Sequence, residues 1–248
     1  MSSSATSPFI SRIPAAARLI YVSTEASLPD NLLPNSLPTW IARHYAGEGG
    51  GDRGRLPLPE RAAVRAWLAQ EGIDSQTDVV VYDAGNGSSA ARAWWVLNWA
   101  GHHRVAILDG GLKSGNPEAA AAEPTVFTSH GSFQSITSEE IGQNPQGFLL
   151  VDARGTSAFD GDGSAPAHLP GAINIPMALL QDAEGKLLPY SQRKGLVDEF
   201  NLKQRDRPLV IYCGSGNAAA WLAAALQDLD IDPTLYVGSW SAWSARQA

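Results

Sequence analysis

Short apolar runs recur along the chain, separated by longer amphipathic stretches. Three of the runs, at residues 78–83, 148–153 and 208–213, are almost continuously apolar. Strands that are buried on both faces of a parallel sheet have this composition. The stretches at residues 59–72 and 138–145 have the length and spacing of helices. The pattern therefore predicts an α/β fold in which helices flank mostly parallel sheets.

The order of these elements occurs twice. Residues 58–83 align without a gap with residues 188–213, at an offset of 130 (188 minus 58). Each copy has Leu-Pro, a helical stretch, a polar turn, a strand and then a loop of small residues. Such a repeat predicts two α/β domains in tandem. We place them at residues 8–115 and 135–248, with a linker rich in Ala, Pro, Gly and Ser at residues 116–134.

The one cysteine of the chain, Cys213, ends the last apolar run and precedes a glycine-containing loop. Ligands of open α/β sheets bind at this carboxyl edge. Glycines at 214 and 216 let the loop N–H groups turn inward, and the following helix adds the positive end of its dipole. These features favour a thiolate, a bound anion or a persulfide. The residues expected to bind substrate or persulfide around the candidate nucleophile Cys213 are Gly214, Ser215, Gly216, Asn217, Ala218 and Ala219.

Three other roles are compatible with parts of this cysteine loop. A lone cysteine is most often a small buried hydrophobe, but the flanking glycines argue against that role here. The loop also matches the nucleotide-binding pattern G-x-G-x-x-A, yet the next strand, within residues 234–240, lacks the acidic residue that binds ribose. A cysteine phosphatase would need an arginine to hold phosphate, and residues 214–220 contain none.

Composition narrows the class of protein further. The net charge of -7 over 248 residues argues against a nucleic-acid partner. One cysteine excludes intramolecular disulfides and multi-cysteine metal sites, and the five histidines lack metal-ligand spacing. No secretory signal and no apolar run long enough to span a membrane are evident. We therefore expect no membrane association and a cytoplasmic location, where a lone thiol stays reduced.

Two tandem halves with a cysteine only in the second resemble the rhodanese superfamily of sulfurtransferases. Residues 79–112 are similar to the family's inactive N-terminal half. Residues 167–176 resemble its G-H-I-P-G-A-x-N-x-P stretch, and residues 236–243 resemble its C-terminal closing motif. The Cys-Gly-Ser-Gly loop resembles the 3-mercaptopyruvate branch, whereas the thiosulfate branch usually has basic residues there.

This resemblance implies an enzyme in which Cys213 carries sulfur. A small donor, 3-mercaptopyruvate or thiosulfate, would give a sulfane sulfur to the thiolate, and a thiol or cyanide acceptor would take it. The resemblance implies that Ser215 assists proton movement and that no metal or organic cofactor is needed. The alternatives are a carrier that receives sulfur from a partner protein, and a catalytically feeble binding module that keeps the fold.

The arginines that the resemblance implies for substrate binding are only partly present. Arg154 matches the family, but Ala158 stands where a further arginine is expected. A loop of the first domain offers Arg53 and Arg55 within a glycine-rich stretch, and we expect these cations to replace the family arginines that are missing around Ala158.

Two more residues have expected places near the site. Arg92 matches an arginine of the family's N-terminal half and is expected to fix the domain interface. Trp240, in the closing motif, is expected to lie near the active edge.

Overall fold

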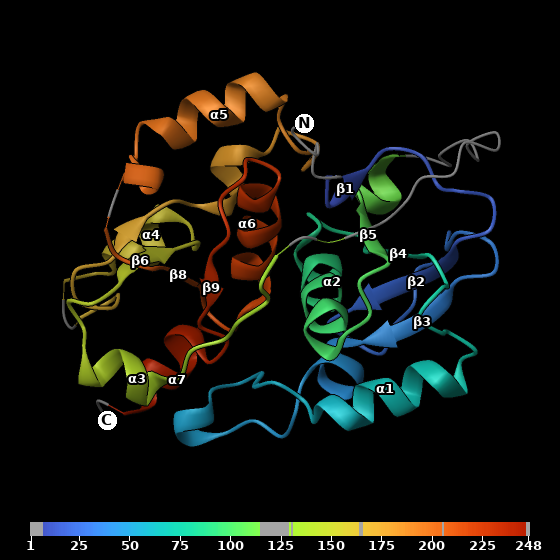
Figure 1. Cartoon of the computed structure of the whole chain (residues 1–248), viewed down its shortest axis with the longest axis horizontal. Helices are drawn as coiled ribbons and strands as arrows, with labels where there is room; N and C mark the ends of the chain where they lie inside the picture. Colours follow the sequence, from blue (N-terminus) through green and yellow to red (C-terminus); the bar gives the residue numbers. More distant parts are fainter. Residues whose placement is uncertain (1–6, 115–128, 130, 164–165, 205, 247–248) are drawn as a thin grey trace.

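The computed structural model describes residues 7–114, 129, 131–163, 166–204 and 206–246. Two parallel sheets with flanking helices make up this part of the chain (Figure 1). This confirms the predicted α/β fold with two similar domains. Most of the predicted linker at residues 116–134 lies outside the described residues.

The first domain holds a five-stranded sheet in the order β1-β5-β4-β2-β3. Its strands are β1 (Phe9–Ile10), β2 (Arg18–Ser23), β3 (Leu37–Trp40), β4 (Val79–Tyr82) and β5 (Val105–Leu108). Its helices and helical turns are η1 (Ile41–Tyr45), η2 (Gly51–Arg53), α1 (Arg61–Gln70), α2 (Ser88–Ala100) and η3 (Gly111–Ser114).

The second domain holds a four-stranded sheet in the order β7-β6-β8-β9. Its strands are β6 (Leu149–Asp152), β7 (Ile173–Asn174), β8 (Leu209–Tyr212) and β9 (Thr234–Leu235). Its helices and helical turns are α3 (Ser138–Gln143), α4 (Thr156–Asp160), η4 (Met177–Leu180), α5 (Tyr190–Asp198), η5 (Leu202–Gln204), α6 (Asn217–Gln227) and α7 (Ser239–Ala245).

The repeat in the sequence is also a repeat of sheet topology. In the first domain the central strand β4 lies between β2 and β5, and in the second domain the central strand β8 lies between β6 and β9. The register agrees as well, because Val79 of β4 pairs with Arg18 and Leu209 of β8 pairs with Leu149. Asp83 and Cys213 therefore follow equivalent strands, at the same edge of their sheets.

Helices α2 and α6 pack against each other between the two sheets (Figure 1). Helix α6 is rich in buried alanines, which allow close approach, and one continuous apolar core includes residues of both domains. The rings of Trp221 in α6 and Phe9 in β1 pack edge to face, with a centroid distance of 5.5 Å. This packing places the starts of both helices, and the loops before them, close to the domain interface.

The segment between β3 and α1 crosses from the first domain to α7 of the second (Figure 1). Gly54 sits tightly there: a Cβ at this position would lie 2.6 Å from the Gly238 oxygen and 2.8 Å from the Ser241 Oγ. The Arg55 N–H also donates to Ser241 Oγ at 3.0 Å. The segment is thus docked on α7, which was not foreseen from its glycine-rich sequence.

This docking predicts that Gly54→Ala releases the segment. Gly50→Ala is a matched control, because both glycines have positive φ and extended ψ, but a Cβ at Gly50 meets nothing within 4 Å. Both changes cost backbone strain. The clash at Gly54 adds about 1–3 kcal/mol, so trypsin should cleave after Arg53 or Arg55 roughly fivefold faster or more in Gly54→Ala than in Gly50→Ala. Equal cleavage rates would show that the contact with α7 does not hold the segment.

Candidate active site

Cys213 lies directly after β8 and is 3% exposed. Its Sγ accepts a hydrogen bond from the Gly216 N–H at 3.1 Å. Gly216 has a φ of +96° and immediately precedes α6. This left-handed backbone, which favours glycine, turns the chain so that an amide faces the sulfur within four residues. The predicted strand, loop and helix arrangement is therefore present around the sulfur.

The start of α7 holds the backbone of Cys213 in place. Ser239 Oγ accepts from the Cys213 N–H at 3.1 Å and donates to the Tyr236 carbonyl at 2.8 Å. The Trp240 N–H donates to the Cys213 carbonyl at 2.9 Å, and the Ser241 N–H donates to the Gly214 carbonyl at 3.0 Å.

Ser239 was not identified from the sequence as a site residue. It is fully buried and has a φ of +55°, a conformation that costs energy for a residue with a Cβ. Its place within the closing motif of residues 236–243 was the available signal. The tertiary structure shows why a serine is useful there: one hydroxyl links the carboxyl ends of β8 and β9.

Asp83 occupies in the first domain the position that Cys213 occupies in the second. Asp83 is 4% exposed, and its carboxylate accepts four backbone hydrogen bonds, from the N–H groups of Gly85, Gly87, Ser89 and Ala90 at 2.9–3.1 Å. The strand, loop and helix of the first domain thus form a cradle of amides around a negative charge. The repeat aligns Asp83 with Cys213, but the pattern of residues along the chain does not indicate this role of Asp83.

The amides at the helix starts correspond when α2 and α6 are aligned at their first residues, although the loop of the first domain, residues 84–87, is one residue longer than residues 214–216. Gly87 then corresponds to Gly216, and the N–H of each bonds the side chain that ends the preceding strand. Ser89 and Ala90 correspond to Ala218 and Ala219, whose N–H groups belong to the first turn of α6 and have no intrahelical acceptor.

The remaining loop residues line the same turn. Gly214, Ser215, Asn217 and Ala218 are half-buried, whereas Gly216 and Ala219 are buried. The Asn217 Oδ1 is a buried acceptor without a hydrogen-bond partner among the described residues.

Arg55 and Arg92 of the first domain both reach this loop. Arg55 Nη2 lies 3.2 Å from the position that a Cβ on Gly214 would take, and the side chain is exposed. Arg92 Nη1 lies 2.7 Å from the corresponding position at Gly216, and the side chain is fully buried. The two cations therefore approach the loop from different environments: Arg55 is exposed to solvent, and Arg92 is buried in the protein interior.

Arg154 is held by its own domain. Its guanidinium bonds both oxygens of Asp152 at 2.6–3.0 Å and the Ala167 carbonyl at 2.7 Å, and it lies 5.1 Å from the centroid of the Trp240 ring. Burial alone lowers the pKa of Arg154, but Asp152, together with the charges of Tyr212 and Cys213, gives a net increase. Arg154 and Trp240 thus lie near the site, with the arginine already paired.

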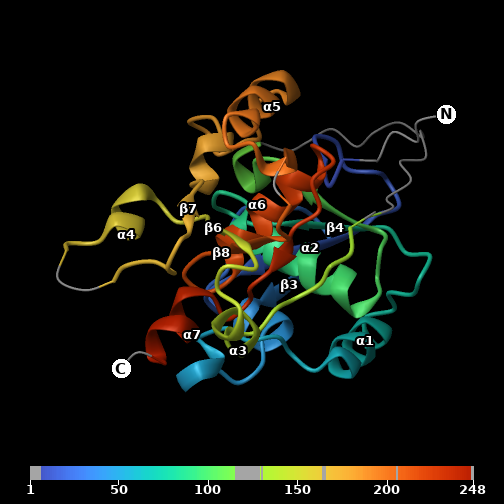
Figure 2. The ribbon, with the colours of Figure 1, turned by 60° about the vertical axis from the view of Figure 1, so that its left-hand side comes forward.

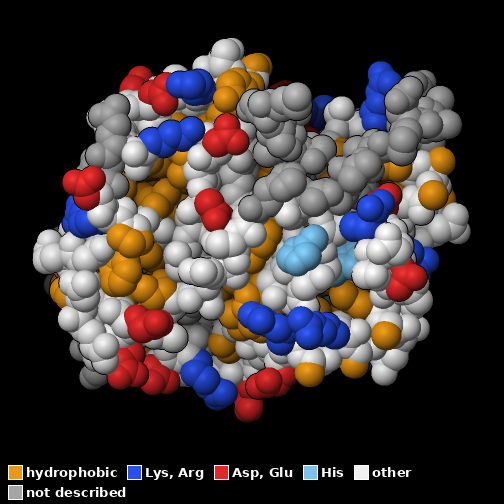
Figure 3. All heavy atoms as spheres, viewed as in Figure 1, with side chains coloured by type: hydrophobic (Ala, Val, Ile, Leu, Met, Phe, Trp, Pro, Cys, Tyr) orange, Lys and Arg blue, Asp and Glu red, His pale blue; other side chains and the backbone are white. Residues whose placement is uncertain are grey.

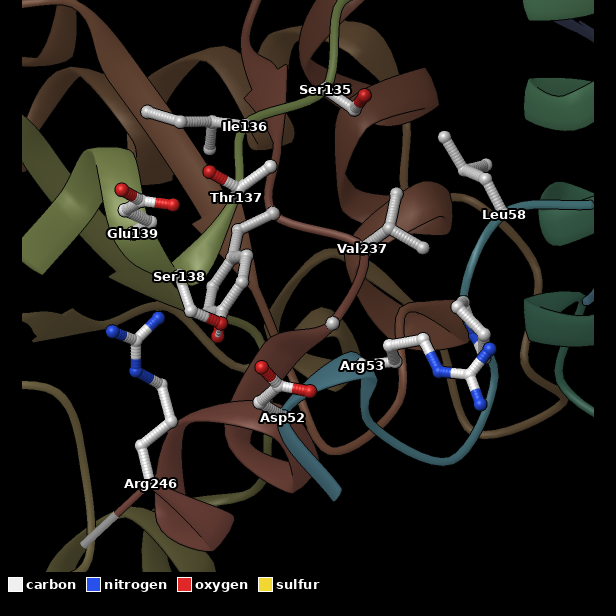
Figure 4. Close-up of a pocket in the computed structure, with 13 residues that line it drawn as sticks. Asp52, Arg53, Leu58, Ser135, Ile136, Thr137, Ser138, Glu139, Val237 and Arg246 are labelled. Atoms are coloured by element: carbon white, nitrogen blue, oxygen red, sulfur yellow. Dashed lines mark hydrogen bonds between the residues drawn. The ribbon is translucent and has the colours of Figure 1, made fainter. Parts of the chain in front are cut away.

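Arg53 is not brought to the cysteine loop. It lines a separate interdomain cavity of about 330 Å³ together with Asp52, Glu139 and Arg246, beside the start of α3 and the end of β9 (Figure 4). Neither Cys213 nor any residue of 214–219 lines that cavity. The structure therefore separates Arg53 from Arg55, although only one residue lies between them in the sequence.

Ala158 and its neighbours lie on α4, which extends outward from the second domain (Figure 2). Ala158 and Asp160 are exposed. His168 packs on the Phe159 ring at a centroid distance of 3.9 Å, and its Nδ1 hydrogen-bonds the Phe159 carbonyl at 2.8 Å. The histidine therefore holds this loop together.

Other kinds of site are not indicated by the part of the chain that the structure describes. No group of His, Cys, Asp and Glu side chains in that part has the geometry to hold a metal ion. Across the same residues, every helix is too short or too polar to cross a membrane. On the face shown in Figure 3, the coloured Lys and Arg side chains are interspersed with Asp and Glu.

Comparison with known proteins connects this site to a family. The rhodanese-like domain family matches residues 31–116 and 136–246. The putative thiosulfate sulfurtransferase SseB of Mycobacterium tuberculosis is 37% identical over 78% of this chain and 73% of its own length. The 3-mercaptopyruvate sulfurtransferase of Escherichia coli is 32% identical over 77% of this chain and 73% of its own length.

Solved structures agree with these matches. The 3-mercaptopyruvate sulfurtransferase from Leishmania major superposes with a TM-score of 0.70 at 22% identity, covering 94% of this chain and 71% of that protein. SseA from Escherichia coli superposes with a TM-score of 0.64 at 25% identity, covering 91% and 93%. Two matched domains, and relatives above 30% identity over most of the chain, confirm the resemblance seen in the sequence motifs. The chain belongs to the rhodanese family, as a tandem-domain member related to the thiosulfate and 3-mercaptopyruvate sulfurtransferases.

Proposed function

We propose that this protein is a sulfurtransferase that carries a sulfane sulfur as a persulfide on Cys213. The donor is a small anionic molecule, 3-mercaptopyruvate or thiosulfate, and the acceptor is a thiol or cyanide. The site residues are Cys213 and the loop Gly214–Ala219, with Arg55 at its open side.

The comparison of the two cradles carries this proposal. In the first domain, the Asp83 carboxylate accepts hydrogen bonds from backbone amides of the loop before α2 and of the first turn of α2. In the second, Gly216 bonds the Cys213 sulfur, and the Ala218 and Ala219 amides correspond to those that bind the second carboxylate oxygen. The outer sulfur of a cysteine persulfide is two bonds from Cβ, as a carboxylate oxygen of aspartate is. These amides therefore suit an anionic outer sulfur.

The chemistry follows from a thiolate held in that cradle. The Cys213 thiolate attacks the transferable sulfur of the donor, so an S–S bond forms. With thiosulfate the S–S bond of the donor breaks and sulfite leaves. With 3-mercaptopyruvate the C–S bond breaks, and the thiol proton moves to the carbon so that pyruvate leaves. A thiol or cyanide then attacks the outer sulfur and regenerates the thiolate.

Arg55 is the side chain best placed to hold the negative group of the donor. It is exposed beside Gly214, at the side of the loop open to solvent, and its backbone is fixed on Ser241. Arg154 is paired with Asp152, and Arg53 lines another cavity. Of the three arginines first expected to bind substrate, Arg55 thus has the most suitable position. A cytoplasmic location, which keeps the lone thiol reduced, is part of the proposal.

Sulfur transfer from small donors tests the proposal directly. Purified protein should produce thiocyanate or a small persulfide from 3-mercaptopyruvate or thiosulfate, and donor alone should add one sulfur atom (about 32 Da) to intact protein by mass spectrometry. Cys213→Ser should abolish both results, because an alkoxide cannot carry a sulfane sulfur.

Two outcomes would contradict this function. Sulfur accepted only from a cysteine desulfurase, with no turnover of either small donor, would assign the protein to a relay between proteins. No sulfur addition from any donor, with the protein folded, would leave a binding module.

The separation of Arg53 from Arg55 predicts different kinetic effects. Arg55→Gln should raise the donor KM roughly 2- to 5-fold with little change in kcat, since an exposed charge contact is worth up to about 1 kcal/mol. Arg53→Gln should leave the donor KM near that of the wild type, and it is the matched control from the same segment. Equal effects of the two changes in steady-state kinetics would show that the segment acts through its overall charge rather than through Arg55.

A further inference from the structure

Arg92 is a fully buried cation that the first domain presents to the cysteine loop. It lies on α2, and its Nε and Nη2 donate to the backbone carbonyls of Tyr45, Leu56 and Pro57 at 2.9–3.2 Å. These carbonyls belong to the segment that crosses to α7. Three acceptors satisfy one side of the guanidinium and fix its orientation.

The other side of the guanidinium has no acceptor. Arg92 Nη1 is buried and makes no hydrogen bond to any described residue. It faces Gly216, because a Cβ there would lie 2.7 Å from Nη1 and 3.1 Å from the Val237 carbonyl. Gly216 is the residue whose N–H bonds the Cys213 sulfur. An unpaired donor inside a protein is costly, so its position beside this loop calls for an explanation.

The charge of Arg92 also lacks a carboxylate partner. Among the described side chains, no Asp or Glu forms an ion pair with it. Burial lowers the pKa of Arg92 to about 10, and the Cys213 sulfur acts in the opposite direction. The group is therefore cationic at neutral pH. A buried charge without a counter-charge is energetically unfavourable.

We infer that the sulfur of Cys213 is the counter-charge of Arg92. Nη1 favours the thiolate of the resting protein and, on the basis of the proposed function, the persulfide of the loaded protein. Arg92 is thus a positioning residue that acts through charge, whereas the Gly216 amide touches the sulfur directly. Its role goes beyond fixing the domain interface, which was the expectation from the sequence.

Other charges near Cys213 differ from Arg92 in burial or pairing. Arg154 is paired with Asp152, and Arg55 is exposed to screening by solvent. Of these three arginines, only Arg92 is both fully buried and without an acidic partner. Its replacement should therefore have the largest effect on the reactivity of the Cys213 sulfur. This also explains why Gly216 has to be glycine: a side chain there would push the guanidinium or the Val237 carbonyl away.

The rate of Cys213 alkylation by iodoacetamide, measured against pH, tests this inference in the full chain. The chain has one cysteine, so the reaction reports on that thiol alone. Arg92→Gln should slow alkylation near neutral pH about tenfold and move the profile to higher pH, as loss of a nearby opposite charge does. Arg92→Lys should keep most of the wild-type rate.

An arginine outside the interface with the cysteine loop serves as a control for the loss of a positive charge. Arg65 also donates to a backbone carbonyl, that of Ala100, at the far end of α2. Arg65→Gln should leave the alkylation profile unchanged. A profile of Arg92→Gln that overlays that of the wild type would overturn the inference, even if sulfur turnover is normal. If the alkylation profile of Arg92→Gln is shifted but the wild-type protein accepts no sulfur from any donor, the proposed function is wrong and the inferred pair of Arg92 and Cys213 still holds.

A second measurement avoids substitution of Arg92, in case Arg92→Gln does not fold. If the thiolate is the counter-charge, wild-type protein gains stability relative to Cys213→Ser as pH rises from about 6 to about 8, toward the titration of an unfolded thiol. The difference in Tm between the two proteins should therefore grow over this range. A constant difference would overturn the inference.

Discussion

The packing of α2 on α6 is the constraint on which the candidate site depends. Each helix follows a strand of its own sheet, and the loop before each helix carries the residue at the carboxyl edge. Because the two helices share one apolar core, the first domain is held against the loop of the second. A shift of this interface would move Arg92 away from Gly216 and the Arg55 backbone away from Ser241. The geometry around Cys213 is thus a property of the pair of domains.

The same backbone design is used for two purposes. In the first domain the cradle is filled by the covalently attached carboxylate of Asp83, so it is closed to other anions. In the second domain a thiol takes the same position, and a thiol can bind one further sulfur atom. The loop and the first turn of the helix supply the backbone amides that converge on the charge. The chemistry depends on the one side chain that follows the strand, Asp83 or Cys213.

The charges around the sulfur are arranged by degree of burial. Arg92 lies in the dry interface, Arg154 is half-buried and neutralised by Asp152, and Arg55 is exposed. Electrostatic interaction weakens as solvent access increases. We therefore assign the buried cation to the sulfur itself and the exposed cation to the diffusing donor. Ser239, which has a strained backbone conformation, accepts the hydrogen bond of the Cys213 N–H and so holds the backbone of the cysteine in place.

The sequence by itself determined the α/β fold, the tandem repeat and the position of Cys213, because these depend on local patterns. Continuous apolar runs predict buried parallel strands, and the cysteine and the glycines of the site are contiguous. The positions of Arg53, Arg55 and Arg92 relative to the cysteine loop were decided by tertiary structure alone. Arg53 and Arg55 have the same local context, yet with Gly54 docked on α7 Arg53 lines the interdomain cavity and Arg55 lies beside Gly214. The unpaired side of Arg92, and the hydroxyl of Ser239 that joins two strands, depend on contacts between distant segments. Such contacts arise from the packing of whole elements, and no spacing along the chain encodes them.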